Sequence, residues 1–177
     1  MGEQYLAHCP VCGYETAFSI GVGFAYPSVF VNVQDSAKSG KLGVTLKKFL
    51  VAHPDGAVNP ECVLARCEKC GEYQTVPDLT MHIPSKGKHP KKKPQNGWLN
   101  RLSNERVGKY GDDSFNNEGY FSPIDLKEQF EVYKLYPHRC HKCRCKLKII
   151  PQTEFDKLKC PHCEEQILVV KHTAFWD

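Results

Sequence analysis

Eight of the ten cysteines occur as four Cys-x-x-Cys pairs, which is the sequence pattern of thiolate metal sites. The paired residues are Cys9/Cys12, Cys67/Cys70, Cys140/Cys143 and Cys160/Cys163. Two residues between cysteines allow a tight turn to direct both sulfurs at one ion about 2.3 Å away. Since a tetrahedral shell needs two such turns, the sequence predicts two four-cysteine sites holding two Zn²⁺ ions per chain.

Four pairs can be combined into two sites in three ways, and we predict that pairs adjacent in the sequence share an ion. Sixteen residues separate Cys143 from Cys160, a spacing typical of a single small zinc site. The two N-terminal pairs are much further apart, because the second begins only at Cys67. The residues between Cys12 and Cys67 must then fold as an inserted layer between the two turns.

Three of the pairs resemble the knuckles of zinc-ribbon proteins. Cys9-Pro10-Val11-Cys12-Gly13 and Cys160-Pro161-His162-Cys163 are similar to the family's Cys-Pro-x-Cys knuckle, and Cys67-Glu68-Lys69-Cys70-Gly71 lacks only the proline. The resemblance implies knuckles that cap small antiparallel sheets around structural zinc. A weaker similarity links the widely split N-terminal pairs to bacterial CpXC-type domains. Arg144 and Glu164 depart from the pattern, because glycine usually follows the second cysteine.

Two other chemistries use the same residue types. Cys9 to Tyr14 is also similar to a rubredoxin knuckle, so an electron-transfer iron in the first site is an alternative to zinc. Cys160-Pro161-His162-Cys163 matches the active-site tetrapeptide of thioredoxin-fold oxidases. Only fourteen residues follow Cys163, which is too few for the helix that this fold requires, so we do not expect a thioredoxin fold.

The remaining cysteines and several histidines are weaker candidates. Cys62 and Cys145 are expected to be buried as small hydrophobic residues, although Cys145 competes with Cys143 as a ligand. Four histidines flank the knuckles and are expected to be solvent-exposed neighbours rather than ligands: His8, His138, His141 and His162.

The hydrophobic pattern predicts short elements that position these pairs. Residues 41–53 form the best helix candidate, since Leu46, Phe49 and Leu50 share one face and Pro54 follows. Ser122-Pro123 is typical of a helix start. A helix over 98–107 is also compatible with the sequence. Segments 29–33 and 130–136 are ambiguous between strand and helix. Expected strands lie at 14–20, 73–76, 79–83, 146–150 and 166–170.

The charge is concentrated in the middle of the chain. The net charge is +4, but residues 81–110 carry eight Lys or Arg and one Asp or Glu, which gives +7 there. Candidate nucleic-acid contacts are Lys86, Lys88, Lys91, Lys92, Lys93 and Arg144. The lysine run lacks interleaved aromatic residues, so a solvated linker is the favoured interpretation.

We therefore expect a small, metal-stapled α+β protein with two zinc-ribbon-like units and short antiparallel sheets, the first unit carrying a helical insertion. The expected domains are 1–83, a basic flexible connector at 84–119, and 120–177. No export signal or apolar span is recognisable, so we expect a cytoplasmic location and no membrane partner. No catalytic motif is recognisable either, which favours a non-catalytic binding or adaptor module with a protein partner. Nucleic-acid binding is the second hypothesis.

Overall fold

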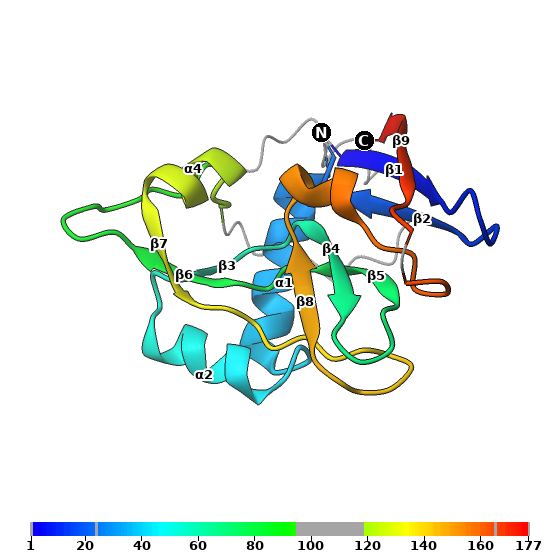
Figure 1. Ribbon diagram of the computed structural model, residues 1–177. Helices are drawn as coiled ribbons and strands as arrows, with labels where there is room; N and C mark the ends of the chain where they lie inside the picture. The colour runs from blue at the N-terminus through cyan, green and yellow to red at the C-terminus, as the bar shows by residue number, and fades with distance from the viewer. Residues whose placement is uncertain (1, 24, 95–118, 165, 177) are drawn as a thin grey trace, which may run out of the picture. The chain divides into compact units, whose positions relative to one another are not determined.

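The computed structural model describes residues 2–23, 25–94, 119–164 and 166–176 of this chain. These residues form a small α+β structure with short antiparallel sheets (Figure 1). Within them, no helix is long and apolar enough to cross a membrane. The predicted helix at 98–107 and most of the predicted connector lie outside the described residues.

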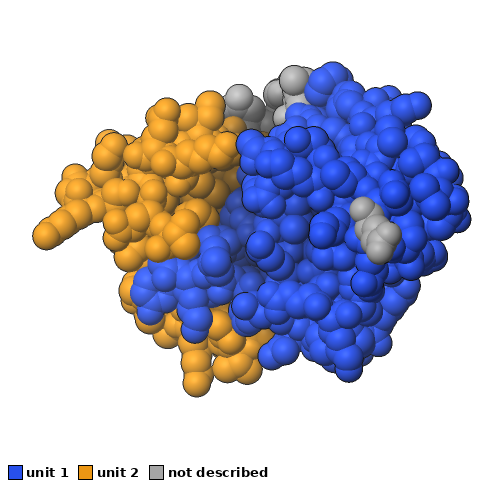
Figure 2. Space-filling view, viewed as in Figure 1, with its two compact units in different colours: residues 1–25, 59–81, 133–177 blue, residues 26–58, 82–132 orange. Residues whose placement is uncertain are grey.

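The chain divides into two compact units, and each is assembled from separate segments (Figure 2). Unit 1 comprises residues 1–25, 59–81 and 133–177, and unit 2 comprises residues 26–58 and 82–132. Each unit therefore draws on chain from both sides of the predicted connector. All eight paired cysteines belong to unit 1.

Unit 1 contains two three-stranded antiparallel sheets with the same topology. In one sheet the central strand β1 (Gly2–His8) lies between β2 (Glu15–Ile20) and β9 (Val169–Trp176). In the other, β4 (Cys62–Cys67) lies between β5 (Tyr73–Pro77) and β8 (Leu147–Ile150). Each sheet thus joins one local hairpin to one strand from the C-terminal part of the chain (Figure 1).

The hairpins β1-β2 and β4-β5 of the two sheets also share their register, so a position in one hairpin has an equivalent in the other. His8 faces Glu15 and Val169, whereas Arg66 faces Tyr73 and Lys148. The two hairpins therefore correspond position by position, with His8 equivalent to Arg66 and Glu15 equivalent to Tyr73. This internal repeat makes the two cysteine sites directly comparable, residue by residue.

The core of unit 1 joins the first sheet to the 3-10 helix η1 (Gln152–Lys157). Tyr5 stacks on Phe18 at a ring distance of 5.5 Å, and Phe155 packs edge-on against both rings. Leu64 on β4 belongs to the same cluster, which also includes the buried Cys9 and Cys160. A smaller cluster around Ala65 and Leu147 contains Cys67 and Cys140.

Unit 2 is built on two helices, α1 (Tyr26–Ser39) and α2 (Val44–Ala52). Most of a short sheet, with the strand order β3-β6-β7, also belongs to unit 2, and only a few residues at the strand ends fall in unit 1. The strands are β3 (Ala57–Val58), β6 (Met81–Pro84) and β7 (Phe130–Lys134). The buried Gln34 amide ties α1 to β3, since it donates to the Val58 carbonyl at 2.8 Å and accepts from the Val58 N–H at 3.2 Å. A short helix, α4 (Pro123–Glu128), also belongs to this unit.

Several sequence predictions are confirmed and two are corrected. Helix α2 buries Leu46, Phe49 and Leu50 as predicted. Helix α4 begins after Ser122, and β7 resolves the ambiguity at 130–136 in favour of a strand. The strand interpretation of 29–33 is wrong, because this segment lies within α1. Its β-branched residues alternate only locally, whereas the buried side chains follow the helical spacing of Phe30, Gln34 and Ala37. The closing strand is later and longer than predicted.

Candidate metal centres

The structure brings the eight paired cysteines together in two groups of four. Site 1 consists of Cys9, Cys12, Cys160 and Cys163, and site 2 consists of Cys67, Cys70, Cys140 and Cys143. The first pair therefore meets the fourth, and the second meets the third. This nested arrangement corrects our prediction that sequence-adjacent pairs come together. The strand pairing explains it, because β9 and β8 carry their preceding knuckles to the hairpins of β1 and β4 respectively.

The spacing of the sulfurs fits a metal-thiolate shell. Sγ–Sγ distances are 3.5 Å from Cys9 to Cys163 and 3.5 Å from Cys12 to Cys160. In site 2 the distances are 3.4 Å from Cys67 to Cys143 and 3.7 Å from Cys70 to Cys140. A disulfide needs about 2.05 Å. A tetrahedron of sulfurs about 2.3 Å from a central ion places them about 3.8 Å apart. Both groups are therefore near enough to bind a metal ion.

All four knuckles use the same local turn. In each pair, the residue after the second cysteine donates its backbone N–H to the carbonyl oxygen of the first cysteine. The distance is 3.1 Å from Gly13 to Cys9 and 2.9 Å from Arg144 to Cys140. The donor residue always has a positive φ: 72° at Gly13, 71° at Gly71, 62° at Arg144 and 55° at Glu164. The departures from glycine noted in the sequence therefore leave the turn intact. Arg144 and Glu164 adopt the left-handed conformation despite their side chains.

The knuckle turn divides each pair into a buried and a more accessible sulfur. The first cysteines are at most 2% exposed, whereas Cys12 and Cys70 are exposed and Cys143 and Cys163 are half-buried. Backbone N–H groups inside the turn point at the buried sulfur. In site 2 the N–H groups of Lys69 and Cys70 lie 3.4 and 3.5 Å from Cys67 Sγ.

The thiol pKa values follow this division. The N–H of Cys12 donates to Cys9 Sγ and lowers the pKa of Cys9 to about 6. Burial opposes this effect, whereas the N–H of Val11 adds to it. The N–H of Cys143 has the same effect on Cys140, whose pKa is also lowered to about 6. Burial, reinforced by the neighbouring sulfurs of Cys9 and Cys160, raises the pKa of Cys163 to about 12.

The chemical consequence is that each group prefers partial ionisation when the four thiols are alone. A dication at the centre would supply the positive charge that lets all four sulfurs ionise together. The donor set of each group, four sulfurs and no oxygen or nitrogen, fits a soft or borderline cation such as Zn²⁺ or iron. Four thiolates also complete a tetrahedral shell.

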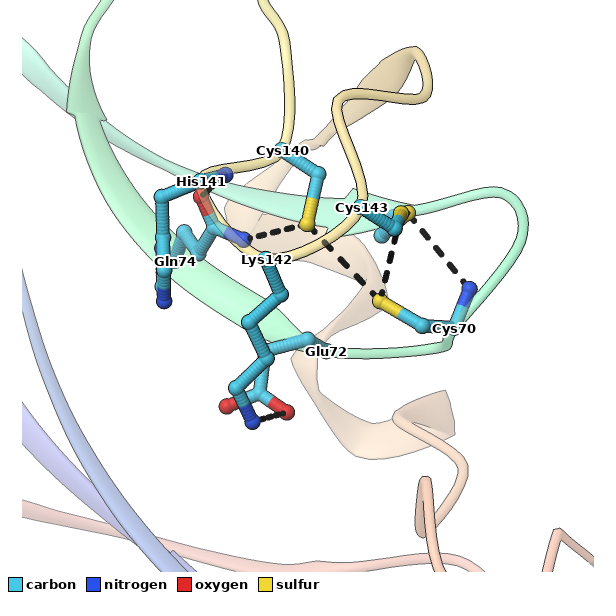
Figure 3. A network of polar contacts seen from close by, with 8 residues as sticks. Cys70, Glu72, Gln74, Cys140, His141, Lys142 and Cys143 are labelled. Carbon is cyan, nitrogen blue, oxygen red and sulfur yellow. Dashed lines mark hydrogen bonds and ion pairs between the residues drawn. The ribbon is translucent and has the colours of Figure 1, made fainter.

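Side chains next to the sulfurs reinforce site 2 (Figure 3). The amide of Gln74, on β5, donates from Nε2 to Cys140 Sγ at 3.0 Å. Its Oε1 accepts the backbone N–H of His141 at 3.3 Å. Lys142 Nζ lies 2.7 Å from Glu72 Oε2. Both contacts connect the hairpin that carries Cys67 and Cys70 to the knuckle that carries the other two ligands.

Other candidates from the sequence are outside the two groups. Among the described residues, the groups close enough to share an ion contain no histidine. His138 is buried rather than solvent-exposed as predicted, and its Nε2 hydrogen-bonds the Asp78 carbonyl oxygen at 2.8 Å. The His162 ring packs on Tyr14. Cys143 rather than Cys145 completes site 2. Cys62, on β4, and Cys145 are half-buried, which corrects the prediction that both are buried.

The basic residues predicted as nucleic-acid contacts belong to both units. Lys93 forms an ion pair with Asp125 at 2.9 Å, and Lys88 donates to the Glu128 carbonyl oxygen at 3.1 Å, both within unit 2. Lys86, Lys91 and Lys92 are exposed in the same unit. Arg144 is exposed on the site 2 knuckle in unit 1.

Comparisons with known proteins identify no family for this chain. No protein-family model, no curated protein and no solved structure matches it. The two cysteine groups are consistent with zinc-ribbon-like sites, and this likeness rests on the geometry described above.

Sequence reasoning missed the nested pairing and the contacts of Gln74. A signal for the pairing was present in the knuckles themselves. The pairs at 9–12 and 67–70 are both followed by glycine and a strand, whereas the other two pairs are followed by Arg144 and Glu164. Two kinds of knuckle in two sites suggest that each site takes one of each kind. The contacts of Gln74 have no such signal, because they depend on which knuckle faces β5.

Proposed function

We propose that each cysteine group holds one Zn²⁺ ion as a structural ligand shell, giving two ions per chain. The observation that carries this proposal is the set of Sγ–Sγ distances of 3.4 to 3.7 Å, close to the edge of a zinc-thiolate tetrahedron. None of the ten cysteines forms a disulfide, which accords with a reducing, cytoplasmic compartment. Because four sulfurs fill the shell, no position is left for water or substrate, which favours a structural ion.

Metal analysis of the reduced protein tests this proposal. We expect native mass spectrometry and elemental analysis to give two zinc ions and a colourless protein. A protein that is red when oxidised and contains iron would replace zinc with the rubredoxin-like alternative at that site. A reduced, metal-supplied preparation that binds no metal would contradict the proposal.

Removal of the metal should unfold unit 1. Structural zinc in small peptides contributes an apparent binding energy of ~10–16 kcal/mol. This matches or exceeds the ~5–15 kcal/mol stability of a typical domain. We therefore expect excess chelator to abolish the cooperative thermal transition of unit 1, measured by circular dichroism. Zinc, but not magnesium, should restore it. A transition that persists after complete zinc removal would show that the ions are dispensable.

For the biological role, we propose a non-catalytic module that binds a protein partner along β9. Among the described strands, β9 is at the edge of its sheet, so one row of its backbone groups has no strand partner there and suits an added strand. Three apolar side chains on or next to it are exposed: Ile167 by 53%, Val169 by 41% and Phe175 by 62%. Val169→Lys should abolish recovery of a cross-linked partner that the unaltered protein recovers. Val44→Lys, at a valine of unit 2 that is 66% exposed, should leave recovery unchanged.

Nucleic-acid binding is the second candidate. It is favoured by the basic segment 139–148, which contains the Cys140/Cys143 knuckle of site 2. Five cations between residues 139 and 148 are exposed: Arg139, Lys142, Arg144, Lys146 and Lys148. Of these, Lys142 already pairs with Glu72. Binding to DNA or RNA that weakens steeply with added salt would support this function. No binding at low salt would exclude it.

A further inference from the structure

The internal repeat allows the surroundings of the two cysteine groups to be compared position by position. Gln74 in site 2 corresponds to Thr16 in site 1, because each is the second residue of the strand that follows its knuckle. In the second knuckle of each site, the first cysteines Cys140 and Cys160 correspond, so His141 corresponds to Pro161. These four positions differ in their hydrogen-bonding capacity.

In site 2, Gln74 forms a two-point clamp across the site. Its Nε2 donates to Cys140 Sγ at 3.0 Å and its Oε1 accepts the His141 N–H at 3.3 Å. Figure 3 shows the amide reaching from β5 to the facing knuckle. Cys140 is fully buried, so this amide replaces hydration that the sulfur lacks. A hydrogen bond to a thiolate stabilises the charged, metal-binding form of the sulfur.

Site 1 cannot form the same clamp. Pro161 has no N–H, so the backbone donor supplied by His141 in site 2 is missing there. Thr16 has a side chain two heavy atoms shorter than that of Gln74. The pair that joins the hairpin to the knuckle also differs. Glu72 and Lys142 form an ion pair in site 2, whereas the corresponding Tyr14 and His162 form a ring contact at 4.7 Å in site 1.

We propose that Gln74 is a positioning residue that makes site 2 the slowly releasing metal site and leaves site 1 as the readily releasing one. This inference rests on the proposed function, since it assumes that both groups hold an ion. It assigns the two sites different roles. Site 2 retains its ion and stabilises the fold of unit 1. Site 1 loses its ion first when the concentration of free zinc falls.

The test is zinc release into excess chelator, followed by absorbance of a colorimetric zinc indicator. We expect two phases of equal amplitude in the unaltered protein. Gln74→Met keeps the length of the side chain and removes its donor and acceptor. It should accelerate the slow phase about 10-fold, the lower end of the effect of removing an outer-shell partner. Thr16→Val, the matched change at the equivalent position of site 1, should leave the slow phase unchanged.

The sites are assigned by a pulse of thiol-alkylating reagent during release, followed by peptide mass mapping. We expect Cys12 and Cys163 to be alkylated in the fast phase and Cys70 and Cys143 in the slow phase. Equal release rates, the opposite order of alkylation, or a slow phase insensitive to Gln74→Met would each overturn the inference while two bound zinc ions still support the proposed function. A chain that binds no zinc at the outset would overturn both.

Discussion

At the residue scale, the turn of each knuckle depends on one left-handed residue directly after the second cysteine. Glycine occupies this position at residues 13 and 71, where φ > 0 carries no penalty from a Cβ atom. Arg144 and Glu164 adopt φ values of 62° and 55° at the same position. A residue with a side chain in this region costs roughly 1–2 kcal/mol. The metal-binding turns of the C-terminal knuckles are therefore formed under local strain.

This strain predicts that glycine stabilises the C-terminal knuckles. Arg144→Gly and Glu164→Gly should each raise the free energy of unfolding by about 0.5–1 kcal/mol, because relief of strain exceeds the added freedom of the unfolded chain. Urea unfolding of the metal-loaded protein measures the change.

Gly13→Ala is the matched control for this prediction. A Cβ atom at Gly13 meets nothing within 4 Å, so its substitution introduces backbone strain alone. We expect it to lower the free energy of unfolding by about 1 kcal/mol. If glycine at residues 144 and 164 instead destabilises the protein, the two side chains must contribute interactions that outweigh the strain.

At the scale of elements, helix α4 depends on a capping box built from Ser122 and Asp125. Ser122 Oγ accepts the Asp125 N–H at 3.3 Å, and an Asp125 carboxylate oxygen accepts the Ser122 N–H at 2.8 Å. Lys93 adds an ion pair to this carboxylate. Burial opposes ionisation of Asp125, but the hydrogen bonds from Ser122 and Lys93 outweigh it and lower the pKa of the carboxyl. The box therefore connects the start of α4 to the basic segment that precedes residue 95.

The lowered pKa of Asp125 predicts an acid dependence of stability. Since the folded-state pKa is below the unfolded value of about 3.9, the stabilising contribution is complete above that value. It is lost as the pH falls through the folded-state pKa. The melting temperature of Asp125→Asn should thus lie below that of the unaltered protein by a constant amount at pH 5–7, and the difference should shrink below about pH 4.

A comparison between variants separates this effect from acid release of the metals, which is common to both proteins. Glu128→Gln replaces an exposed carboxylate of the same helix. Its melting temperature should differ from that of the unaltered protein by the same amount above and below pH 4. Ser122→Ala should cost about 1 kcal/mol at neutral pH, the usual value of a lost N-cap. A pH-independent difference for Asp125→Asn would mean that the carboxylate is not selectively stabilised by folding.

At the scale of the whole molecule, the nested pairing of the four knuckles is the main organising feature of unit 1. Strand β9 pairs with β1 over seven positions and β8 with β4 over four, which fixes the partner of each hairpin. The loops closed in this way are long, because one runs from Cys12 to Cys160 and the other from Cys70 to Cys140. Sequence-adjacent pairing would close much shorter loops, from Cys12 to Cys67 and from Cys143 to Cys160.

The nested pairing makes a prediction for double variants. Cys9→Ala combined with Cys160→Ala removes two ligands of one site, so the chain should retain one zinc ion. Cys9→Ala combined with Cys67→Ala removes one ligand from each site, so both ions should be lost or weakly held. Native mass spectrometry of each double variant counts the ions.

Sequence-adjacent pairing reverses both expectations, so the experiment distinguishes the two arrangements. Cys145→Ala is the matched control, since this cysteine neighbours a ligand without belonging to either group. It should leave both ions bound. If the first double variant binds no zinc and the second binds one, the nested arrangement is wrong.

The sequence by itself determined the features that depend on a few neighbouring residues. A Cys-x-x-Cys pair forms its turn through contacts between near neighbours in the chain, so all eight sulfurs and their grouping in pairs were predictable. The same applies to α2, whose apolar residues repeat with helical spacing, and to α4, whose N-cap is recognisable from Ser122-Pro123. Local chemistry alone also indicated a soft metal at a site with four sulfurs.

Only the tertiary structure decided which pairs meet, because the free energies that separate the alternatives are not local. Closing the longer loops costs only about 2 kcal/mol more than closing the shorter ones, since the entropy grows with the logarithm of loop length. Strand pairing of β9 and β8 and burial of the clusters around Phe155 and Leu147 outweigh that difference. Short spacing in the sequence is therefore a weak guide to shared ligands. The clamp of Gln74 follows from the same cause, since it exists only where β5 faces the knuckle that contains His141.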